Sequence, residues 1–426
     1  MIEAPPKTTA AETRKAFSLA GNEEFRAVIT ECTAKYLYWD KVKYLSGAFD
    51  PRVVWAFLLW SRRMNSSSVC LGKYQFRISV TNAMQEVLHH FDMQMGGIIP
   101  VSSVASKEEQ KYYLLSSFME EAIASSQMEG ASTTRKVAKE MLRKNEAPKD
   151  VSQRMIVNNY NTIRYLSEHK TDALTPASLC MIHQMITERT LDSPDEETEY
   201  RTTDDIVVAD GISGEVAHVP PPSAELPDLV DELCAFFNTD ECASGFIHPV
   251  VKAIAIHFFV AWIHPFTDGN GRTARALVYW FLLQKGYSLV EYLSISRIIY
   301  RSKAQYEKAF LYTEKMDGDL GYFLQYNLTA MQKAMDELGT YLKRKISEKN
   351  DLSSYVKRGL NQRQAKFLAY MKQNADSVVT VAEYQSICGV SNQTARTDLY
   401  ALCKSGVLQE IPLNKRKAGF LLSGNA

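Results

Sequence analysis

Twelve residues in the second half of the chain, HPFTDGNGRTAR, run from His264 to Arg275 and combine a histidine, an aspartate, two glycines and two arginines. Histidine can act as a general base near neutral pH. The Asp-Gly-Asn-Gly run stands at the start of an expected helix, where backbone N–H groups can converge on an anion. These residues therefore indicate a phosphate-binding site, with an ordinary turn between two helices as the alternative.

The two arginines strengthen the phosphate interpretation. Arg272 falls in the first turn of the expected helix and Arg275 follows three residues later, so both can point to one side. Two guanidinium groups near a helix N-terminus oppose the helix dipole by roughly a few tenths of a kcal/mol, and an anionic ligand reverses that sign. Asp268 in this setting is expected to bind Mg²⁺, because Mg²⁺ on phosphates usually takes one or two carboxylates. The stretch is not a Walker A loop, since GxxxxGK[ST] is missing.

The elements around this loop are expected to be two helices and a hairpin. The segment VVKAIAIHFFVAWI has helical spacing and ends at His264, and a second helix begins with RTARALVYWFLLQK at Arg272 and stops at Gly286. Upstream, the β-like runs DIVV and EVAHV flank the turn-rich ADGISG, and prolines follow. This pattern predicts a β-hairpin over about 200–221.

The twelve residues match, at every specified position, the signature HPFx[DE]GNGRxxR, and the chain therefore resembles the Fic family. The resemblance implies a mainly α fold: a Fic helical core with a β-hairpin flap, a helical N-terminal segment and a small C-terminal winged-helix domain. It also implies transfer of AMP from ATP, with Mg²⁺, to a Tyr, Ser or Thr hydroxyl of a target protein, or of the chain itself, with release of pyrophosphate.

The same resemblance assigns roles to single residues. His264 would be the catalytic base, Asp268 the Mg²⁺ ligand, and Arg272 and Arg275 the partners of the β- and γ-phosphates. Tyr306 would contact the nucleotide base, although its neighbour is Glu307 where the family often has a second tyrosine, so the nucleotide preference stays open. The flap would hold the target by strand addition at Val207, Val208 and His218. The expected ATP-binding residues are Gly269, Asn270, Gly271, Arg272, Thr273, Ala274, Arg275, Tyr306 and Glu129.

A second stretch, SSQMEGA, resembles the inhibitory motif [S/T]xxxE[G/N] of the family through Ser125, Glu129 and Gly130. The preceding residues predict a helix over about 115–130, with Gly130 as its C-cap and Glu129 in the last turn. The resemblance implies that Glu129 pairs with Arg275 and keeps ATP from binding productively. A solvated glutamate is the plain alternative, and in some relatives the same residue serves AMP removal.

Other polar residues have plainer interpretations. His248 and His257 lack a carboxylate at HExxH spacing and are interpreted as structural, and His89–His90 have no identifiable partner. The acidic stretch DSPDEETEY is expected to be a solvated loop. Seven scattered cysteines without CxxC spacing predict reduced thiols, and no signal peptide or membrane span is apparent, because the most apolar stretch carries a lysine and two histidines. We therefore expect a cytoplasmic protein without membrane contact.

The chain has 426 residues and a formal net charge of zero, and we expect three parts: residues 1–104, 105–345 and 353–426, joined across the polar stretch RKISEKNDLSSY. The last part carries ten Lys and Arg against four Asp and Glu and resembles DeoR-type winged-helix domains. Two alternatives therefore stay open: a DNA-binding regulator with a nucleotide-sensing Fic core, or an enzyme acting mainly in AMP removal. A homodimer is also an open partner. The cations that could meet DNA phosphates are Arg396, Lys404, Lys415, Arg416 and Lys417.

Overall fold

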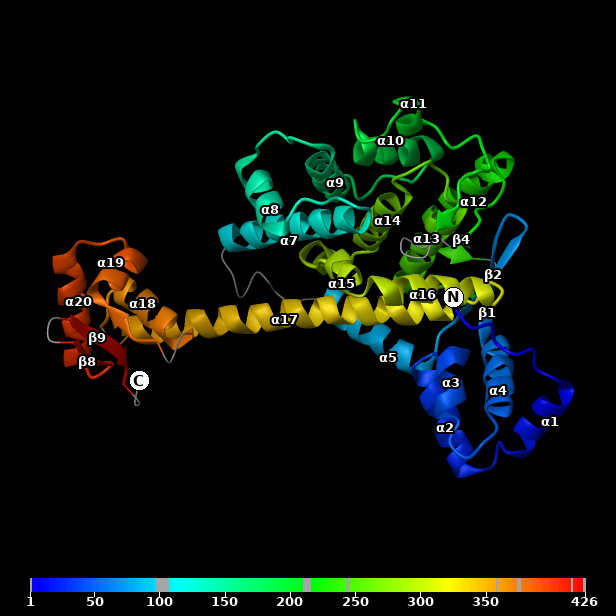
Figure 1. The fold of residues 1–426 in the computed structure, drawn as a ribbon, viewed down its shortest axis with the longest axis horizontal. Coiled ribbons are helices and arrows are strands. Elements are labelled where there is room, and N and C mark those ends of the chain that lie inside the picture. The colour runs from blue at the N-terminus through cyan, green and yellow to red at the C-terminus, as the bar shows by residue number, and fades with distance from the viewer. Residues whose placement is uncertain are drawn as a thin grey trace. The chain divides into compact units, whose positions relative to one another are not determined.

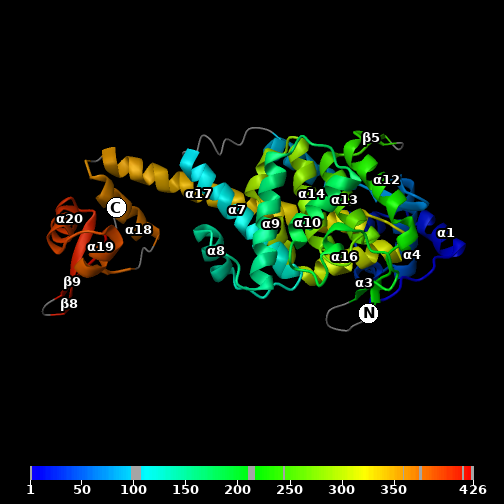
Figure 2. The same cartoon turned by 90° about the horizontal axis from the view of Figure 1, so that it is seen from above.

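A computed structural model gives the fold (Figures 1 and 2). Within the ranges that it describes, no helix has both the length and the apolar run needed to cross a membrane. The chain divides into two compact units, of which one comprises residues 1–100 with 106–338 and the other residues 339–426. The described residues are 2–96, 107–209, 216–242, 245–357, 359–373, 377–414 and 417–423.

The N-terminal segment of the first unit is mainly helical, as the sequence predicts. Its helices begin at side chains that satisfy free backbone N–H groups, for example Thr9, Asn22 and Asp50. Helices α1, α2 and α3 pack on α4, which buries an aromatic face around Trp55. The elements are α1 (Ala10–Ser18), α2 (Glu23–Ala34), α3 (Trp39–Leu45), α4 (Pro51–Met64), α5 (Asn82–Phe91) and the π-helix η1 (Asp92–Gly96).

Two antiparallel strands of this segment, β1 (Ser66–Leu71) and β2 (Tyr74–Ser79), form a hairpin. Strand β2 also bonds to a later segment, because Arg77 N donates to Gly318 O and Leu320 N donates to Arg77 O, both at 2.9 Å. These bonds join the N-terminal segment to the helical core. The expected boundary near residue 104 therefore does not coincide with a break in packing.

The rest of the first unit is helical, and α13 and α14 pack against each other at its centre (Figures 1 and 2). Helix α13 is buried almost all round, as expected for a helix without a polar face. The helices are α7 (Lys107–Met128), α8 (Arg135–Lys144), α9 (Val151–Glu168), α10 (Pro176–Thr187), α11 (Asp195–Thr198), α12 (Leu226–Asn238), α13 (Pro249–Ile263), α14 (Asn270–Gln284), α15 (Ile295–Arg301) and α16 (Lys303–Lys315), with 3-10 turns η2 (Ser223–Glu225) and η3 (Ser288–Tyr292).

The predicted hairpin is present and its strands are short. Strand β3 (Val208–Ala209) pairs antiparallel with β4 (Val216–His218). Residues 210–215, which include all of the expected turn ADGISG except Ala209, lie outside the described residues. A second small hairpin joins β5 (Glu241–Cys242) to β6 (Gly245–Phe246).

The stretch RKISEKNDLSSY, expected to join two parts of the chain, is helical. Helix α17 (Gly321–Lys357) runs through the whole RKISEKNDLSSY stretch. This stretch is polar, but it contains neither Gly nor Pro and has several strong helix formers, so nothing in it ends a helix. Polarity alone is a poor sign of a linker.

After α17, the described part of the second unit contains three helices and a three-stranded sheet. The sheet order is β7-β9-β8 with antiparallel pairs, and its core includes Phe367, Tyr384, Leu399 and Phe420. Lys415 and Arg416, two of the cations that could meet DNA phosphates, lie outside the described residues. The elements are α18 (Gln362–Gln373), β7 (Val379–Thr380), α19 (Val381–Cys388), α20 (Asn392–Lys404), β8 (Leu408–Asn414) and β9 (Lys417–Leu422).

Candidate active site

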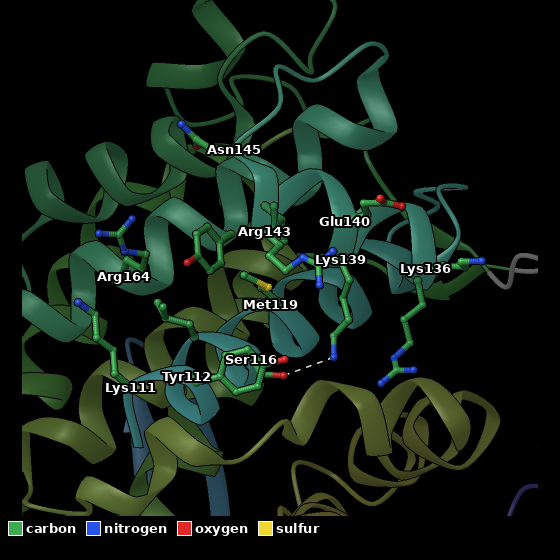
Figure 3. Close-up of a pocket in the computed structure, with 14 residues that line it drawn as sticks. Lys111, Tyr112, Ser116, Met119, Lys136, Lys139, Glu140, Arg143, Asn145 and Arg164 are labelled. Atoms are coloured by element: carbon green, nitrogen blue, oxygen red, sulfur yellow. Dashed lines mark hydrogen bonds between the residues drawn. The ribbon is translucent and has the colours of Figure 1, made fainter. Parts of the chain in front are cut away.

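Two cavities of the first unit differ in the residues that line them. The larger, about 880 Å³, lies among α7, α8 and α9 and is lined by none of the motif residues (Figure 3). The smaller, about 300 Å³, brings together residues from the motif, the inhibitory stretch and the hairpin. We therefore take the smaller cavity as the candidate site. The residues expected from the sequence that line it are Glu129, Val208, His218, His264, Asn270, Gly271, Arg275 and Tyr306.

His264 follows the last residue of α13 and adopts a left-handed conformation with φ of 49°, which is uncommon for a residue with a side chain. Its N–H donates to Val260 O at 3.1 Å, and its carbonyl accepts from Arg201 Nε at 2.8 Å. Arg201 N also donates to Pro265 O at 2.9 Å. Arg201, from the start of the hairpin segment, therefore fixes the backbone at the histidine.

The His264 ring suits proton acceptance. Its Nδ1 lies 3.2 Å from Ala261 O, and a proton on Nδ1 can donate to this carbonyl and leave Nε2 as an acceptor. Burial lowers the pKa of His264 to about 4, and this outweighs the opposing bond to Ala261. The ring is therefore neutral at neutral pH and can take a proton at Nε2.

The N-terminus of α14 is arranged to receive an anion. Gly269 is the N-cap with φ of 79° and gives no side-chain cap. Asn270 uses its side chain to accept from Phe266 N at 3.0 Å and to donate to Phe266 O at 2.8 Å, which closes the loop. The side chain of Asn270 is therefore structural, and the first backbone N–H groups of α14 have no intrahelical partner.

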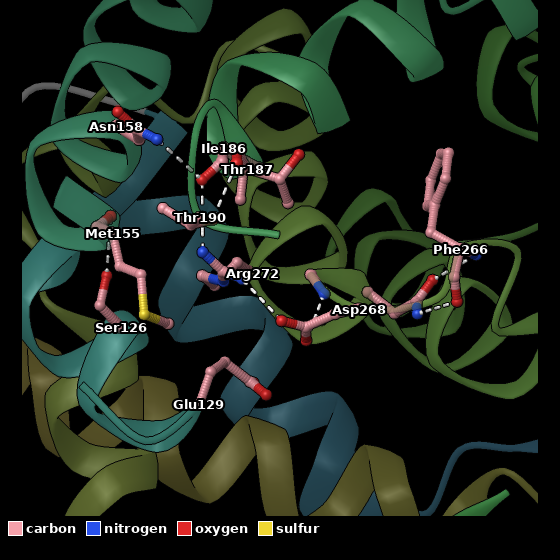
Figure 4. Close-up of polar contacts among 12 residues, drawn as sticks. Ser126, Glu129, Met155, Asn158, Ile186, Thr187, Thr190, Phe266, Asp268 and Arg272 are labelled. Atoms are coloured by element: carbon pink, nitrogen blue, oxygen red, sulfur yellow. Dashed lines mark hydrogen bonds and ion pairs between the residues drawn. The ribbon is translucent and has the colours of Figure 1, made fainter. Parts of the chain in front are cut away.

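Arg272 is fully buried at this helix N-terminus (Figure 4). One guanidinium nitrogen donates to Ile186 O at 3.3 Å and another lies 3.4 Å from Asp268 Oδ2. Burial lowers the pKa of Arg272, although an arginine stays charged. In the part of the chain that the structure describes, its Nε has no partner, and neither has Oγ1 of the adjacent buried Thr273. Ala274 of α14, which was also expected to bind ATP, is fully buried.

Asp268 has the features expected of a ligand for a metal held mainly by phosphate. Its side chain is 57% exposed, and its contact with Arg272 is long at 3.4 Å. Across the described ranges, no three side chains of His, Cys, Asp or Glu gather as a metal cluster. A single accessible carboxylate beside a phosphate-binding helix N-terminus suits Mg²⁺, which keeps waters and takes few protein ligands.

Arg275 is held by the stretch that the sequence identified as inhibitory. Its Nε donates to Ser125 Oγ and one terminal nitrogen to Ser125 O, both at 2.8 Å. A terminal nitrogen also donates to Glu129 Oε1 at 2.9 Å. The expected Glu129–Arg275 ion pair is therefore present, although the two residues are far apart in the sequence.

The Glu129 carboxylate also lies against Gly271 in the first turn of α14. A Cβ atom added to Gly271 would collide with Glu129 Oε1 and would lie 3.1 Å from an Arg275 nitrogen. Burial acts to raise the pKa of Glu129, but the Arg275 charge and hydrogen bond outweigh it and lower the pKa. The carboxylate is therefore ionised at neutral pH, and it lies against the backbone that a phosphate would approach.

Helix α7 differs slightly from the prediction at its end. It finishes at Met128, so Glu129 and Gly130 form the turn that follows rather than the last helical turn. Gly130 has φ of 93°, and Ala131 N donates to Ser126 O at 3.1 Å. These two features end the helix at Met128, before Glu129. Lys303, which the sequence analysis did not identify, donates to Met128 O at 3.2 Å and lines the cavity.

His183 on α10 is a second residue that sequence reasoning missed. It is fully buried and stacked on Phe266, with 3.6 Å between ring centroids. Its Nε2 lies 2.9 Å from Asp268 O and its Nδ1 lies 2.9 Å from Glu197 O. Burial lowers the pKa of His183. The only sequence signal was a lone histidine in a helix, which does not indicate contact with a distant loop.

Tyr306 lies at the cavity as expected, and its hydroxyl is engaged. It is 3.1 Å from Nε2 of His257, and the two rings stack. Burial lowers the pKa of His257 to about 3, so the ring is neutral and can accept this bond. His257 is structural, as predicted, and His248 instead bonds Asp92 at 3.0 Å.

The flap residues differ in where their side chains lie. Val207 is exposed and Val208 lines the cavity. His218 is buried, with Nε2 2.7 Å from Trp262 O and Nδ1 bonded to Glu314. Both ring nitrogens of His218 are thus engaged within the protein, whereas Val207 and Val208 remain accessible to a ligand.

The acidic stretch before the hairpin was expected from its charge to be a solvated loop, but this expectation is wrong for part of it. It forms α11, and Glu197 within it is buried. The Glu197 carboxylate accepts from Arg189 N at 2.6 Å and its carbonyl bonds His183. The stretch therefore supports the loop that carries Asp268.

Residues 173–282 match the family model described as the Fic/DOC family. The protein adenylyltransferase Fic of Culex quinquefasciatus is 34% identical over 119 residues, which are 28% of this chain and 21% of that protein. The protein of the same name from Drosophila virilis is 32% identical over 119 residues, 28% of this chain and 22% of that protein. The matched stretch spans about a fifth of the length of these curated relatives.

The fold is also found in a solved structure. A Fic family protein from Desulfovibrio desulfuricans G20 superposes with a TM-score of 0.52 at 17% sequence identity. The likeness covers 82% of this chain and 98% of that chain. At this identity it concerns the fold alone, and it extends beyond the stretch that matches the family model.

Proposed function

Because residues 173–282 match the Fic/DOC family model, we propose that this chain is a protein adenylyltransferase, which transfers AMP from ATP to a side-chain hydroxyl of a protein. The observation that carries the proposal is the 300 Å³ cavity that His264, Gly271 and Arg275 line together. It combines a neutral base, a helix N-terminus and a buried cation, which are the groups that nucleotidyl transfer requires.

In the proposed reaction, the hydroxyl oxygen of the target attacks the α-phosphorus of ATP. The bond from that phosphorus to the bridging β-oxygen breaks, and pyrophosphate leaves. Nε2 of His264 accepts the hydroxyl proton, since Nδ1 is directed at Ala261 O. The N–H groups at the start of α14 would stabilise the charge on the α-phosphate, and Arg272 and Arg275 would hold the β- and γ-phosphates.

A magnesium ion belongs to the same proposal. Asp268 would hold it together with phosphate oxygens, because its carboxylate is exposed and loosely bound by Arg272. When bound, the ion would neutralise charge on the phosphates of ATP. A cytoplasmic location is also part of the proposal and rests on the scattered cysteines.

We further propose that Glu129 restrains the enzyme. While Glu129 holds Arg275 at 2.9 Å, that guanidinium is not available to the γ-phosphate, and the carboxylate repels a phosphate at Gly271. Replacing Glu129 by glycine should remove both obstacles. We expect an activity increase on the order of 10–100-fold, the range of typical coupling between two sites.

The test uses purified protein with Mg²⁺ and ATP labelled at the α-phosphate. We expect strong self-labelling of Glu129→Gly, weak labelling of the unchanged protein, and none of Glu129→Gly/His264→Ala. Glu146→Gly is the matched control, because Glu146 also follows a helix end but is exposed, and it should label weakly. ATP labelled at the γ-phosphate should leave no label on any variant.

Other outcomes point to other functions. Label from γ-phosphate would indicate phosphoryl transfer and contradict the proposal. Loss of AMP from pre-labelled Glu129→Gly protein when unchanged protein is added would instead favour AMP removal. No labelling of any variant, with ATP binding intact, would refute self-adenylylation and give weight to the regulator described next.

A second candidate function rests on the exposed face of α20 in the second unit. Arg396, Thr397, Tyr400 and Lys404 are exposed there, whereas Asp398 is buried and bonds Arg363 at 2.6 Å. The strand and helix order supports a winged-helix domain, in which this helix would enter the major groove of DNA. Salt-sensitive mobility shift of a specific genomic fragment, lost in Arg396→Ala, would support this candidate.

A further inference from the structure

The larger cavity has a chemistry that the proposed reaction does not use. It is an open cleft of about 880 Å³ among α7, α8 and α9 (Figure 3). We name it the basic cleft after six cationic side chains that line it, and one carboxylate, Glu140, lines it with them. The six are Lys111, Arg135, Lys136, Lys139, Arg143 and Arg164.

Most of this charge comes from one helix. The sequence of α8, RKVAKEMLRK, holds five basic residues and one acidic residue, in a chain whose formal net charge is zero. Lys111 on α7 and Arg164 on α9 add cations from the two neighbouring helices. The charge is therefore a local concentration built by three helices and not a reflection of overall composition.

The cleft compensates only part of its own charge. The buried carboxylate of Glu120 bonds Arg135 Nε at 2.7 Å and pairs with Lys139. Glu140 pairs at 2.7 Å with Lys144, which does not line the cleft.

The other cations of the basic cleft are less well matched. Arg164 has only a distant partner, Glu168, at 3.9 Å. In the described ranges Lys111, Lys136 and Arg143 make no ion pair, and all three are exposed. These three charges are thus available to an anionic partner.

The placement of Arg135 and Lys136 also favours an anion. They are the first two residues of α8, and the N-cap Thr134 makes no side-chain hydrogen bond to the first turn. Cations at this end of a helix oppose the helix dipole, and the free N–H groups there attract negative charge. Arg135 already bonds Glu120, so a bound carboxylate would pair with Lys136 and accept from the free backbone N–H groups.

The rest of the lining indicates a polypeptide rather than a nucleic acid. Leu115, Met119 and Leu142 form an aliphatic part of the lining. Of the two tyrosines, Tyr112 is 69% exposed, but Tyr160 is buried, with the Arg164 guanidinium 5.8 Å from its ring centre. Strand-binding sites for nucleic acids usually stack successive bases on several aromatic faces, and this cleft offers one.

We propose that the basic cleft docks an acidic segment of the protein that the enzyme modifies. Carboxylates of that segment would pair with Lys111, Lys136 and Arg143, and an apolar side chain would pack on Leu115 and Met119. The inference rests on the proposed function, because an enzyme that acts on proteins must also hold them. It specifies the substrate class as proteins with an acidic, apolar-anchored segment.

The test measures fluorescence anisotropy of a short fluorescein-labelled peptide of glutamates and leucines, mixed with the full chain without nucleotide. We expect binding, and at least about tenfold weaker binding to Lys136→Glu/Arg143→Glu, because the reversed charges repel the peptide. The matched control Arg26→Glu/Lys170→Glu changes the net charge equally at exposed positions outside the cleft, and it should bind like the unchanged chain. Lys136→Gln, which removes one charge without repulsion, should show a smaller loss.

Each outcome decides the inference. Equal binding to the two double variants, or no binding at all, would overturn it. The inference would also be overturned if single-stranded oligothymidylate bound more tightly than the peptide and the same cleft substitutions weakened that binding. The cleft would then be a nucleic-acid site. The cleft substitutions should not change self-labelling in the Glu129→Gly background. Peptide anisotropy therefore reports a failure of docking, and self-labelling reports a failure of adenylyl transfer.

Discussion

Helices α14 and α8 begin in a similar way but in different surroundings. Each lacks a side-chain cap at its N-terminus, and each carries cations in its first two turns, Arg272 and Arg275 in one and Arg135, Lys136 and Lys139 in the other. In α14 the arginines are buried and bound by groups of the same protein. In α8 Lys136 is exposed and without an ion pair in the described ranges.

The difference shows how one charge pattern can serve two purposes. Buried cations interact strongly with whatever anion reaches them, and water does not compete. Such a site has to be occupied, and Glu129 occupies it in this structure. Exposed cations are screened by salt and interact weakly one by one, so they contribute to recognition only as a group. The following predictions test this contrast, beginning with the largest expected effect.

Arg275→Ala in the Glu129→Gly background should lower kcat/KM for ATP by about 10²–10³-fold, as expected when a buried donor to transition-state charge is lost. Arg143→Ala in the same background removes an exposed cation and should leave kcat/KM within about twofold. Both are measured as self-labelling rates against ATP concentration. A similar loss in the two variants would refute the contrast between the helices.

Gly269→Ala should destabilise the first unit by about 2–3 kcal/mol, the combined range for strain and overpacking. Gly269 has φ of 79°, and an added Cβ would lie 2.7 Å from Thr187 Cγ2 and 3.1 Å from His183 Nε2. Gly339→Ala is the control, because it is helical and nothing lies within 4 Å of its Cβ. Chemical denaturation should show a loss for the first variant and unchanged or increased stability for the second.

The pH profile of Glu129→Gly should reflect the lowered pKa of His264, about 4. At about pH 5.5 a group with that pKa is almost wholly neutral, whereas a histidine of ordinary pKa is only about one-tenth neutral. The protonated ring cannot accept the proton, so activity is lost as pH falls through the pKa. We expect the self-labelling rate at about pH 5.5 to stay within about twofold of that at pH 7, and a tenfold drop would contradict the lowered pKa.

Salt should separate the two sites. Raising NaCl from about 50 to about 500 mM shortens the screening length severalfold and should weaken binding of the acidic peptide to the basic cleft by at least about fivefold. The Glu129–Arg275 pair is largely buried, so the unchanged protein should self-label weakly at both concentrations. Strong labelling in high salt would show that the inhibitory pair is screened like a surface pair.

Thr134→Asp should have the smallest effect. An acidic N-cap would bond to the first turn of α8 and complement the cations there, which should raise stability by about 0.5–1 kcal/mol. Thr175→Asp is the control, since Thr175 already forms a capping box, and it should change stability less. If thermal unfolding shows no gain for Thr134→Asp, the N-terminus of α8 is not short of negative charge.

The local parts of the fold could be predicted from the sequence. The helices on either side of His264, the hairpin between Val208 and His218, and the elements of the second unit follow from the period of apolar residues and from residues that start or stop a helix. Polarity alone did not reveal that the stretch expected to join two parts is helical, and it gave a wrong prediction for the acidic stretch that buries Glu197. Polarity reports exposure on average and not the conformation of a particular backbone.

The sequence by itself determined the candidate site loop, because the twelve residues from His264 to Arg275 are adjacent and their spacing fixes which groups the start of one helix presents. The tertiary structure alone decided what surrounds that loop. It brings His183 to the Asp268 carbonyl and gathers the basic cleft from three helices. Such contacts depend on how helices far apart in the sequence pack together. The period of apolar residues in one segment does not indicate which other segment it packs against.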